Sequence, residues 1–134
     1  MFSFEFLPDR YAVCRLAADE SLPQWALQND SGKQQFVSLN WTPDELSVVC
    51  RESIVPDDVE SETDWMCMRV AGKLDFSLVG ILARITRYLA DAHISVFAVS
   101  TFDTDYLLVK RSQWPLTIKT LSEAGCKVYP LGDA

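Results

Sequence analysis

The sequence has one histidine, His93, and only five glycines in 134 residues. His93 has no adjacent nucleophile, so it makes a poor catalytic centre, and we expect it at the C-terminal end of a helix. None of the glycines forms the GxGxxG pattern that binds nucleotide phosphates. Cys14, Cys50, Cys67 and Cys126 include no CxxC pair, which leaves a zinc or redox motif unsupported. We therefore expect no enzymatic activity, no metal and no cofactor.

Basic residues and long apolar runs are also scarce. The formal charge is −7, from 12 Lys+Arg against 19 Asp+Glu, and the basic residues are scattered along the chain. A nucleic-acid binder needs a basic face, so we expect no nucleic-acid partner. No apolar run approaches the roughly 20 residues of a membrane helix, and the start MFSFEFLPDR lacks the pattern of a signal peptide. We expect a cytoplasmic protein with no membrane partner.

The second half of the sequence begins with a strand and a helix. Residues 65–70, WMCMRV, predict a strand. Apolar residues then recur at the spacing of one helix face, at Leu78, Ile81, Leu82, Ile85 and Leu89. Asp75 or Ser77 could cap this helix, because either side chain can accept a hydrogen bond from a free amide of the first turn.

Two strands, a second helix and a last strand follow. β-Branched and aromatic residues predict strands over residues 94–101 and 106–110. Pro115 lies early in the next helix, where its missing N–H costs nothing, and Gly125 is the expected left-handed stop. A strand over residues 126–131 closes the half. The order β-α-β-β-α-β is that of an α+β, ferredoxin-like module, with strands on one face and two helices on the other.

The first half repeats this pattern in part. Residues 11–16, YAVCRL, resemble residues 65–70 at an offset of 54, and residues 41–48 resemble residues 102–109 at an offset of 61. The offset grows by 7, so the first half lacks about two helical turns between these points. Three shorter features complete the reading: a helical stub over residues 21–28, a strand over residues 36–39, and a turn or short helix over residues 56–64.

The repeat predicts two ferredoxin-like domains, an abbreviated one over residues 1–61 and a complete one over residues 62–134. A unit of about 60 residues buries only about 60% of its unfolded surface and is marginal alone. We therefore expect the two domains to pack together.

Two sequence elements resemble a known family. Gly80-Ile81-Leu82-Ala83, followed by Ile94-Ser95-Val96 and Ser100-Thr101, resembles the ACT domain. The string VSTFDTDYLLV at residues 99–109 and TPDELSVV at residues 42–49 are similar to a narrower tandem ACT-like family. That family includes small bacterial proteins and the eukaryotic CASTOR arginine sensors, and it is related to the ACT domains of aspartate kinases.

This resemblance implies a regulatory protein that binds a free amino acid, with pairing of ACT domains into a homodimer and a regulated protein partner. It also implies a ligand site between the loop before the first helix and the following strand. The implied ligand-binding residues are Asp75, Phe76, Ser77, Leu78, Gly80, Val99, Ser100, Thr101, Phe102 and Asp103.

The residue types suit an amino acid. The start of the helix after Ser77 offers amides and a positive dipole end to a carboxylate. Asp103 and Asp105 could hold an ammonium through charge-assisted hydrogen bonds. Alternatively, the two acids cap backbone amides in a turn, and Asp44, at the matching place of the first half, favours that role for Asp105. The alternative function is a structural or protein-interaction module that binds no small ligand.

Overall fold

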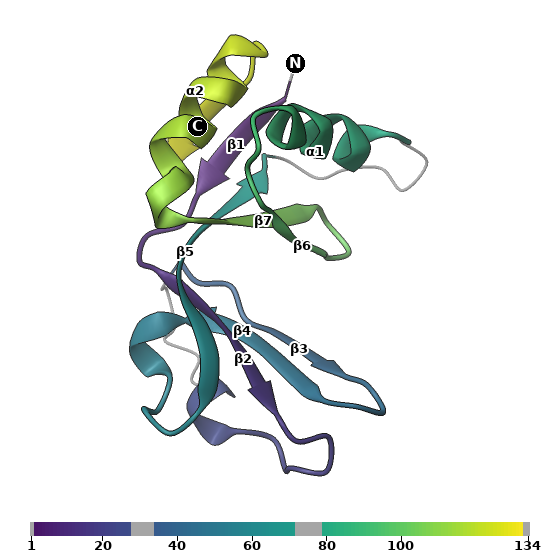
Figure 1. The fold of residues 1–134 in the computed structure, drawn as a ribbon, viewed down its shortest axis with the longest axis vertical. Coiled ribbons are helices and arrows are strands. Elements are labelled where there is room, and N and C mark those ends of the chain that lie inside the picture. Colours follow the sequence, from purple (N-terminus) through teal and green to yellow (C-terminus); the bar gives the residue numbers. More distant parts are fainter. Residues whose placement is uncertain (1, 28–33, 72–78, 133–134) are drawn as a thin grey trace. The chain divides into compact units, whose positions relative to one another are not determined.

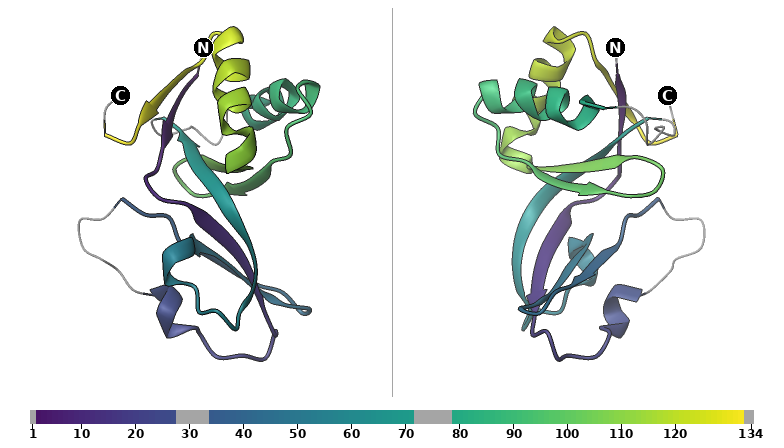
Figure 2. Two further views of the ribbon diagram at one scale, coloured as in Figure 1. Left: turned by 60° about the vertical axis from the view of Figure 1, so that its left-hand side comes forward. Right: turned by 90° about the vertical axis from the view of Figure 1, so that its right-hand side faces the viewer.

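The computed structural model describes residues 2–27, 34–71 and 79–132. The chain forms two compact units, traced in Figures 1 and 2. Unit 1 consists of Met1–Leu7 and Met66–Ala134, and unit 2 of Pro8–Trp65. Along the part of the chain that the structure covers, no helix combines the length and apolar character needed to cross a membrane.

Unit 1 has the expected order of elements. The end of β5 (Glu60–Val70) is followed by α1 (Ile81–Asp91), β6 (Phe97–Ser100), β7 (Asp105–Lys110), the short 3₁₀ helix η3 (Arg111–Gln113), α2 (Trp114–Glu123) and β8 (Lys127–Pro130). The predicted β-α-β-β-α-β order is therefore confirmed. Figure 1 shows α1 and α2 together on one side of these strands.

The core of unit 1 lies between the helices and the sheet. The largest of its fully buried side chains are Phe4, Met68, Ile85, Leu89, Leu107 and Leu121. Ile85 and Leu89 belong to the apolar face that the sequence predicted for α1. The fold class, α+β with a ferredoxin-like module, is confirmed.

Both helices of unit 1 end in the same backbone conformation. His93 has a φ of 60° and Gly125 a φ of 87°, both in the left-handed region. In each case the next amide reaches back five residues, from Ile94 to the Leu89 carbonyl and from Cys126 to the Leu121 carbonyl, at 2.9 Å. These bonds satisfy carbonyls at the helix ends, which confirms the stops predicted at both residues.

Unit 1 contains one strand that the sequence reading missed, β1 (Ser3–Phe6). It pairs antiparallel with β5 and parallel with β8, and the strand order of the unit is β6-β7-β5-β1-β8. Period-two alternation of Phe2, Phe4 and Phe6 is the signal that could have predicted it. Because of this pairing, residues 1–7 group with the second half, which differs from the contiguous ranges 1–61 and 62–134.

Unit 2 is the smaller of the two units. Its strands are β2 (Tyr11–Leu16), β3 (Ser38–Trp41), β4 (Leu46–Arg51) and the first part of β5, antiparallel throughout in the order β3-β4-β2-β5. Its buried core includes Ala12, Cys14, Leu46, Val48 and Cys50. Two 3₁₀ turns, η1 (Gln24–Leu27) and η2 (Glu52–Ile54), are the helical elements among its described residues.

Three expectations for the first half need correction. The stub over residues 21–28 is only the 3₁₀ turn η1, and the strand expected at residues 36–39 lies at Ser38–Trp41. In the acidic segment 56–64, the predicted turn is confirmed at residues 56–59, where the Val59 amide donates to the Pro56 carbonyl, but β5 begins at Glu60. Its residues Glu60, Ser61 and Glu62 pair with β2, and these backbone hydrogen bonds outweigh the low strand propensity of an acidic segment.

The internal repeat has a different register from the one expected. The hairpin β3–β4 corresponds to β6–β7 at a constant offset of 59, both at the first strand (97 minus 38) and at the second (105 minus 46). The offset of 61 from the sequence alone is therefore wrong. In the structural register, Asp44 corresponds to Asp103 and not to Asp105.

Candidate functional site

The tip of the β6–β7 hairpin is a closed turn. The Thr101 amide donates to the Thr104 carbonyl at 2.9 Å, and the Thr101 hydroxyl donates to the same oxygen at 3.0 Å. The Ser100 hydroxyl donates to Asp105 Oδ1 at 2.5 Å across the two strands. Thr101 and Asp105 thus stabilise the hairpin, but Asp105 does so through the Ser100 hydroxyl and not by the backbone capping considered above.

Two expected site residues lie exposed on this tip. Phe102 is 81% exposed, so it does not form the wall of a closed slot within the described unit 1. Asp103 is also exposed, between Phe102 and the buried Thr104. Val99, in β6, is half-buried and faces Tyr106 in the hairpin register.

Thr104 ties the hairpin to β5. It is 6% exposed, and its hydroxyl donates to the Val70 carbonyl at 2.9 Å. Val70 is the last residue of β5, from which the chain continues toward α1. The hydrogen bond therefore places the hairpin tip beside the strand end that leads into the expected ligand loop.

The start of α1 lies at the other side of that loop. Gly80 is the N-cap of α1, with a φ of 80°, and no side chain among the described residues caps it. A Cβ at Gly80 would meet no atom of the described residues within 4 Å. The first amides of a helix have no partner within the helix, so they are available to water or to a ligand. Asp75, Phe76, Ser77 and Leu78 lie outside the described residues, so their roles stay predictions.

Figures 1 and 2 show the start of α1 and the hairpin tip toward the same end of unit 1. The structure thus groups Val99, Ser100, Thr101 and Asp103 on one hairpin and places Gly80 at the helix start. These are the two sides of the site that the sequence predicts.

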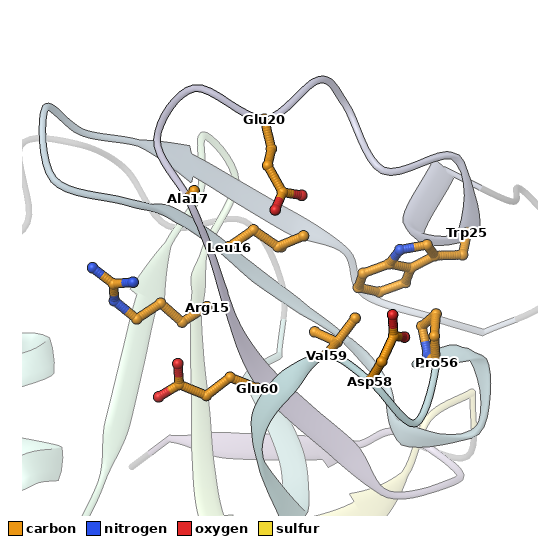
Figure 3. A pocket seen from close by; sticks show the side chains of 9 residues that line it. All are labelled: Arg15, Leu16, Ala17, Glu20, Trp25, Pro56, Asp58, Val59 and Glu60. Atoms are coloured by element: carbon orange, nitrogen blue, oxygen red, sulfur yellow. The ribbon is translucent and has the colours of Figure 1, made fainter.

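Unit 2 holds a pocket of about 500 Å³ that the sequence reading missed. Figure 3 shows its walls, which come from the end of β2, the segment before and within η1, and the turn into β5. Its lining residues are Arg15, Leu16, Ala17, Glu20, Trp25, Pro56, Asp58, Val59 and Glu60. No contiguous motif links them, because tertiary structure brings three separate segments together.

The cysteines are part of the packed interior. Cys14, Cys50, Cys67 and Cys126 are all buried. Cys14 and Cys50 interact in the core of unit 2; this contact lowers the pKa of the Cys14 thiol and, together with burial, raises the pKa of Cys50. Burial raises the pKa of Cys67 to about 12. Among the described residues, no group of three His, Cys, Asp or Glu side chains could hold a metal ion.

Comparison with protein families gives two matches along the chain. A family model for the ACT domain matches residues 60–123, and a second model, for an N-terminal domain, matches residues 9–58. The boundary between the two matches falls close to Glu60, the first residue of β5.

Three individual proteins are similar to this chain. The human protein CASTOR3P is 31% identical over 101 residues, which are 66% of this chain and 62% of that protein. This chain therefore spans less than two thirds of that relative. A crystal structure of an Agrobacterium tumefaciens protein has 35% identity and a TM-score of 0.86, and the match covers 96% of this chain and 92% of the other.

The third is the regulatory subunit of aspartate kinase from Thermus thermophilus, in its ligand-free form. It has 8% identity and a TM-score of 0.60, with 92% of this chain and 97% of that chain covered. At this identity the likeness concerns the fold alone, and it agrees with a tandem of ferredoxin-like modules. The family-model match over β5 to α2 and the similarity to CASTOR3P show that the chain belongs to the ACT-domain family.

Proposed function

We propose that this chain is a regulatory protein that binds a free amino acid and has no catalytic activity of its own. The family supports a regulatory role, since the matched structures include a regulatory subunit. The sequence offers no nucleophile–base pair and no phosphate-binding glycine loop. The Thr104–Val70 hydrogen bond carries the site assignment, because it holds the hairpin tip beside the strand that leads into the loop before α1.

In the proposed site, the amides at the start of α1 receive the ligand carboxylate. A charge at a helix start is stabilised by about 0.3–1 kcal/mol when exposed and by about 2 kcal/mol when partly buried. Micromolar affinity requires a binding free energy of about −8 kcal/mol, so several such contacts must contribute. Asp75, Phe76, Ser77 and Leu78 would supply the loop side of the site.

The hairpin supplies the other side. Asp103 would accept the ligand ammonium, and the Ser100 hydroxyl, fixed by Asp105, would present its remaining acceptor capacity to the same group. Thr101 would act mainly by shaping the turn, since its hydroxyl is bonded to Thr104. Val99 and Phe102 would contact the ligand side chain.

Regulation requires that the ligand bind one state of the protein more tightly than another. We propose that the two states are states of a homodimer, which acts on a protein partner in the cytoplasm. Strand β6 pairs only with β7 among the described strands, so its outer edge offers backbone groups to another chain.

Thermal unfolding of the purified chain with each of the twenty amino acids at millimolar concentration tests the proposal. A ligand at 100 times its Kd adds about 2.7 kcal/mol to the free energy of unfolding, which raises Tm by several degrees for a chain of this size. One amino acid, or one chemical class, should raise Tm. Twenty unchanged Tm values would overturn the amino-acid assignment.

A double variant, Ser100→Ala with Asp103→Ala, tests the site and should abolish the shift. The matched control is Ser122→Ala with Glu123→Ala, two exposed residues at the end of α2, outside the proposed site. Because Ser100→Ala also removes a hairpin hydrogen bond, the unliganded Tm of each variant is measured first. An unchanged ligand shift in the site variant would refute the assignment.

The alternative function is a protein-interaction module that binds no small ligand. Two exposed aromatic side chains near the hairpin tips favour it, Phe102 at 81% exposed and Trp41 at 54%. Exposed aromatic residues are common at protein interfaces. If no amino acid binds, a Phe102→Ser variant that loses a captured protein partner would support this second function.

A further inference from the structure

The pocket in unit 2 carries more acidic than basic groups. Three carboxylates line it, from Glu20, Asp58 and Glu60, against the single guanidinium of Arg15. Its formal charge is therefore −2, from one positive and three negative groups. A concave site with this charge favours a cationic ligand over an anion. The pocket lies wholly within unit 2, so it is separate from the amino-acid site proposed in unit 1.

The cation should be organic and extended, not a metal ion. Within the described residues, no three acidic, histidine or cysteine side chains are grouped closely enough to hold a metal. The carboxylates are thus spread around a space of about 500 Å³, a volume within the roughly 300–1,000 Å³ of small-molecule sites.

One end of the pocket carries charges of both signs. Arg15 donates from Nη2 to the Asp44 carbonyl oxygen at 3.1 Å. Arg15 and Glu60 are partner positions in the β2–β5 register, so this end has one basic and one acidic residue on neighbouring strands. Figure 3 shows both groups on the side of the pocket away from Trp25.

The other end has negative charge without a cation. The Glu20 side chain points from its loop toward Leu16, and Asp58 lies beside Trp25 (Figure 3). Neither Glu20 nor Asp58 forms an ion pair with any residue that the structure describes. The half-buried indole ring of Trp25 adds a negative face, which attracts ammonium groups.

An apolar strip joins the two ends. Leu16 and Val59 are half-buried and lie between the Arg15 end and the Trp25 end in Figure 3. Such a strip suits a short hydrocarbon chain. We propose that this pocket binds an alkyl ammonium, whose charged group lies between Glu20, Asp58 and Trp25 and whose chain covers Leu16 and Val59.

Calorimetric titration of the full chain with 1,5-diaminopentane tests this proposal. The control ligand is 1-pentanol, which has a hydrocarbon chain of the same length but no charge. We expect saturable one-to-one binding of the amine, no binding of the alcohol, and weaker amine binding as salt rises, because salt screens exposed charges. No saturable heat at amine concentrations up to about 10 mM, or equal binding of the alcohol, would overturn the proposal.

Variants locate the binding. Glu20→Gln with Asp58→Asn removes both charges and keeps side-chain shape, so the Kd should rise by about tenfold or more. The matched control is Asp57→Asn, an exposed neighbour that does not line the pocket, which should change the Kd by less than about twofold. Equal effects of the double variant and the control would overturn the assignment.

An alkyl ammonium group can belong to a free diamine or to the side chain of lysine. Comparing the Kd of free lysine with that of the diamine distinguishes these two ligands. If lysine binds more tightly than the diamine and Arg15→Gln removes the difference, the ligand is an amino acid whose carboxylate meets Arg15. If the diamine binds more tightly, the ligand is a free amine. Either order supports an alkyl-ammonium pocket. Amine binding should persist in the Ser100→Ala/Asp103→Ala variant, so failure of one proposed site is distinguishable from failure of the other.

Discussion

Thr42 and Thr101, 59 residues apart, make the same turn in the two units (101 minus 42). The Thr42 amide donates to the Glu45 carbonyl at 2.9 Å, as the Thr101 amide does to Thr104. The Thr42 hydroxyl also accepts the amide of Asp44 at 3.1 Å. The two halves therefore share a turn built on a threonine hydroxyl, with an acid at its third position.

This shared turn should tolerate serine better than valine at its first position. Thr42→Val or Thr101→Val removes the hydroxyl bonds, and each should lower the free energy of unfolding by about 0.5–1.5 kcal/mol. Thr42→Ser and Thr101→Ser keep the hydroxyl and should lose less. Urea unfolding followed by circular dichroism measures the difference; valine and serine variants of equal stability would contradict the assigned role.

Substitutions at the two helix ends of unit 1 should change the stability of the protein in opposite directions. Gly125→Ala puts a Cβ at a φ of 87°, and a left-handed backbone costs a residue with a Cβ roughly 1–2 kcal/mol. His93→Gly removes the same strain at a φ of 60°, so it should be neutral or stabilising by up to about 1 kcal/mol. Thermal unfolding of both variants measures the changes, and destabilisation by His93→Gly would show that its imidazole has a contact role.

Arg69 and Glu5 form a partly buried ion pair across β1 and β5. They are partners in the strand register, Arg69 Nη2 lies 3.4 Å from Glu5 Oε1, and Arg69 also donates to the Tyr106 hydroxyl at 3.4 Å. Glu5 is only 9% exposed. Arg69→Met leaves that carboxylate buried without its cation and should destabilise the protein by about 2 kcal/mol or more.

A second change should rescue that variant. Glu5→Gln added to Arg69→Met removes the uncompensated charge, so the double variant should be more stable than Arg69→Met alone. Chemical unfolding of the wild type, the two single variants and the double variant completes the cycle. Strictly additive effects would show that the pair is not coupled.

Alkaline pH should destabilise the protein through Cys67. Burial raises its pKa from 9.0 to about 12, so the folded state keeps its proton while the unfolded thiol ionises. The stabilisation is complete below about pH 9 and is lost as pH rises from about 9 to 12, by up to about 1.4 kcal/mol per pH unit.

Comparison of two core variants isolates this effect. In Cys67→Ala, the free energy of unfolding should decrease less steeply between about pH 9 and 11 than in the wild type. In Val70→Ala, at another buried position of β5, it should decrease with pH as steeply as in the wild type. Unfolding free energies measured at several alkaline pH values give the slopes. Identical slopes for both variants would mean that Cys67 does not control the pH dependence.

The sequence by itself determined the local structure of unit 1. The three- and four-residue spacing fixed the buried face of α1, including Ile85 and Leu89, and the helix stops at His93 and Gly125 follow from local backbone chemistry. The threonines, serine and acids of residues 100–105 also signalled a turn. These features depend on interactions within a few residues, which one sequence contains in full.

Only the tertiary structure decided which strands pair and in which register. It placed β1 between β5 and β8, extended β5 back to Glu60, and set the repeat offset at 59, because hydrogen bonds between distant segments select the register. The pocket has the same origin, since Arg15, Trp25 and Asp58 come from three segments with no common motif. Local patterns specify elements, but a binding surface depends on which elements meet, and that is set by the packing of the whole unit.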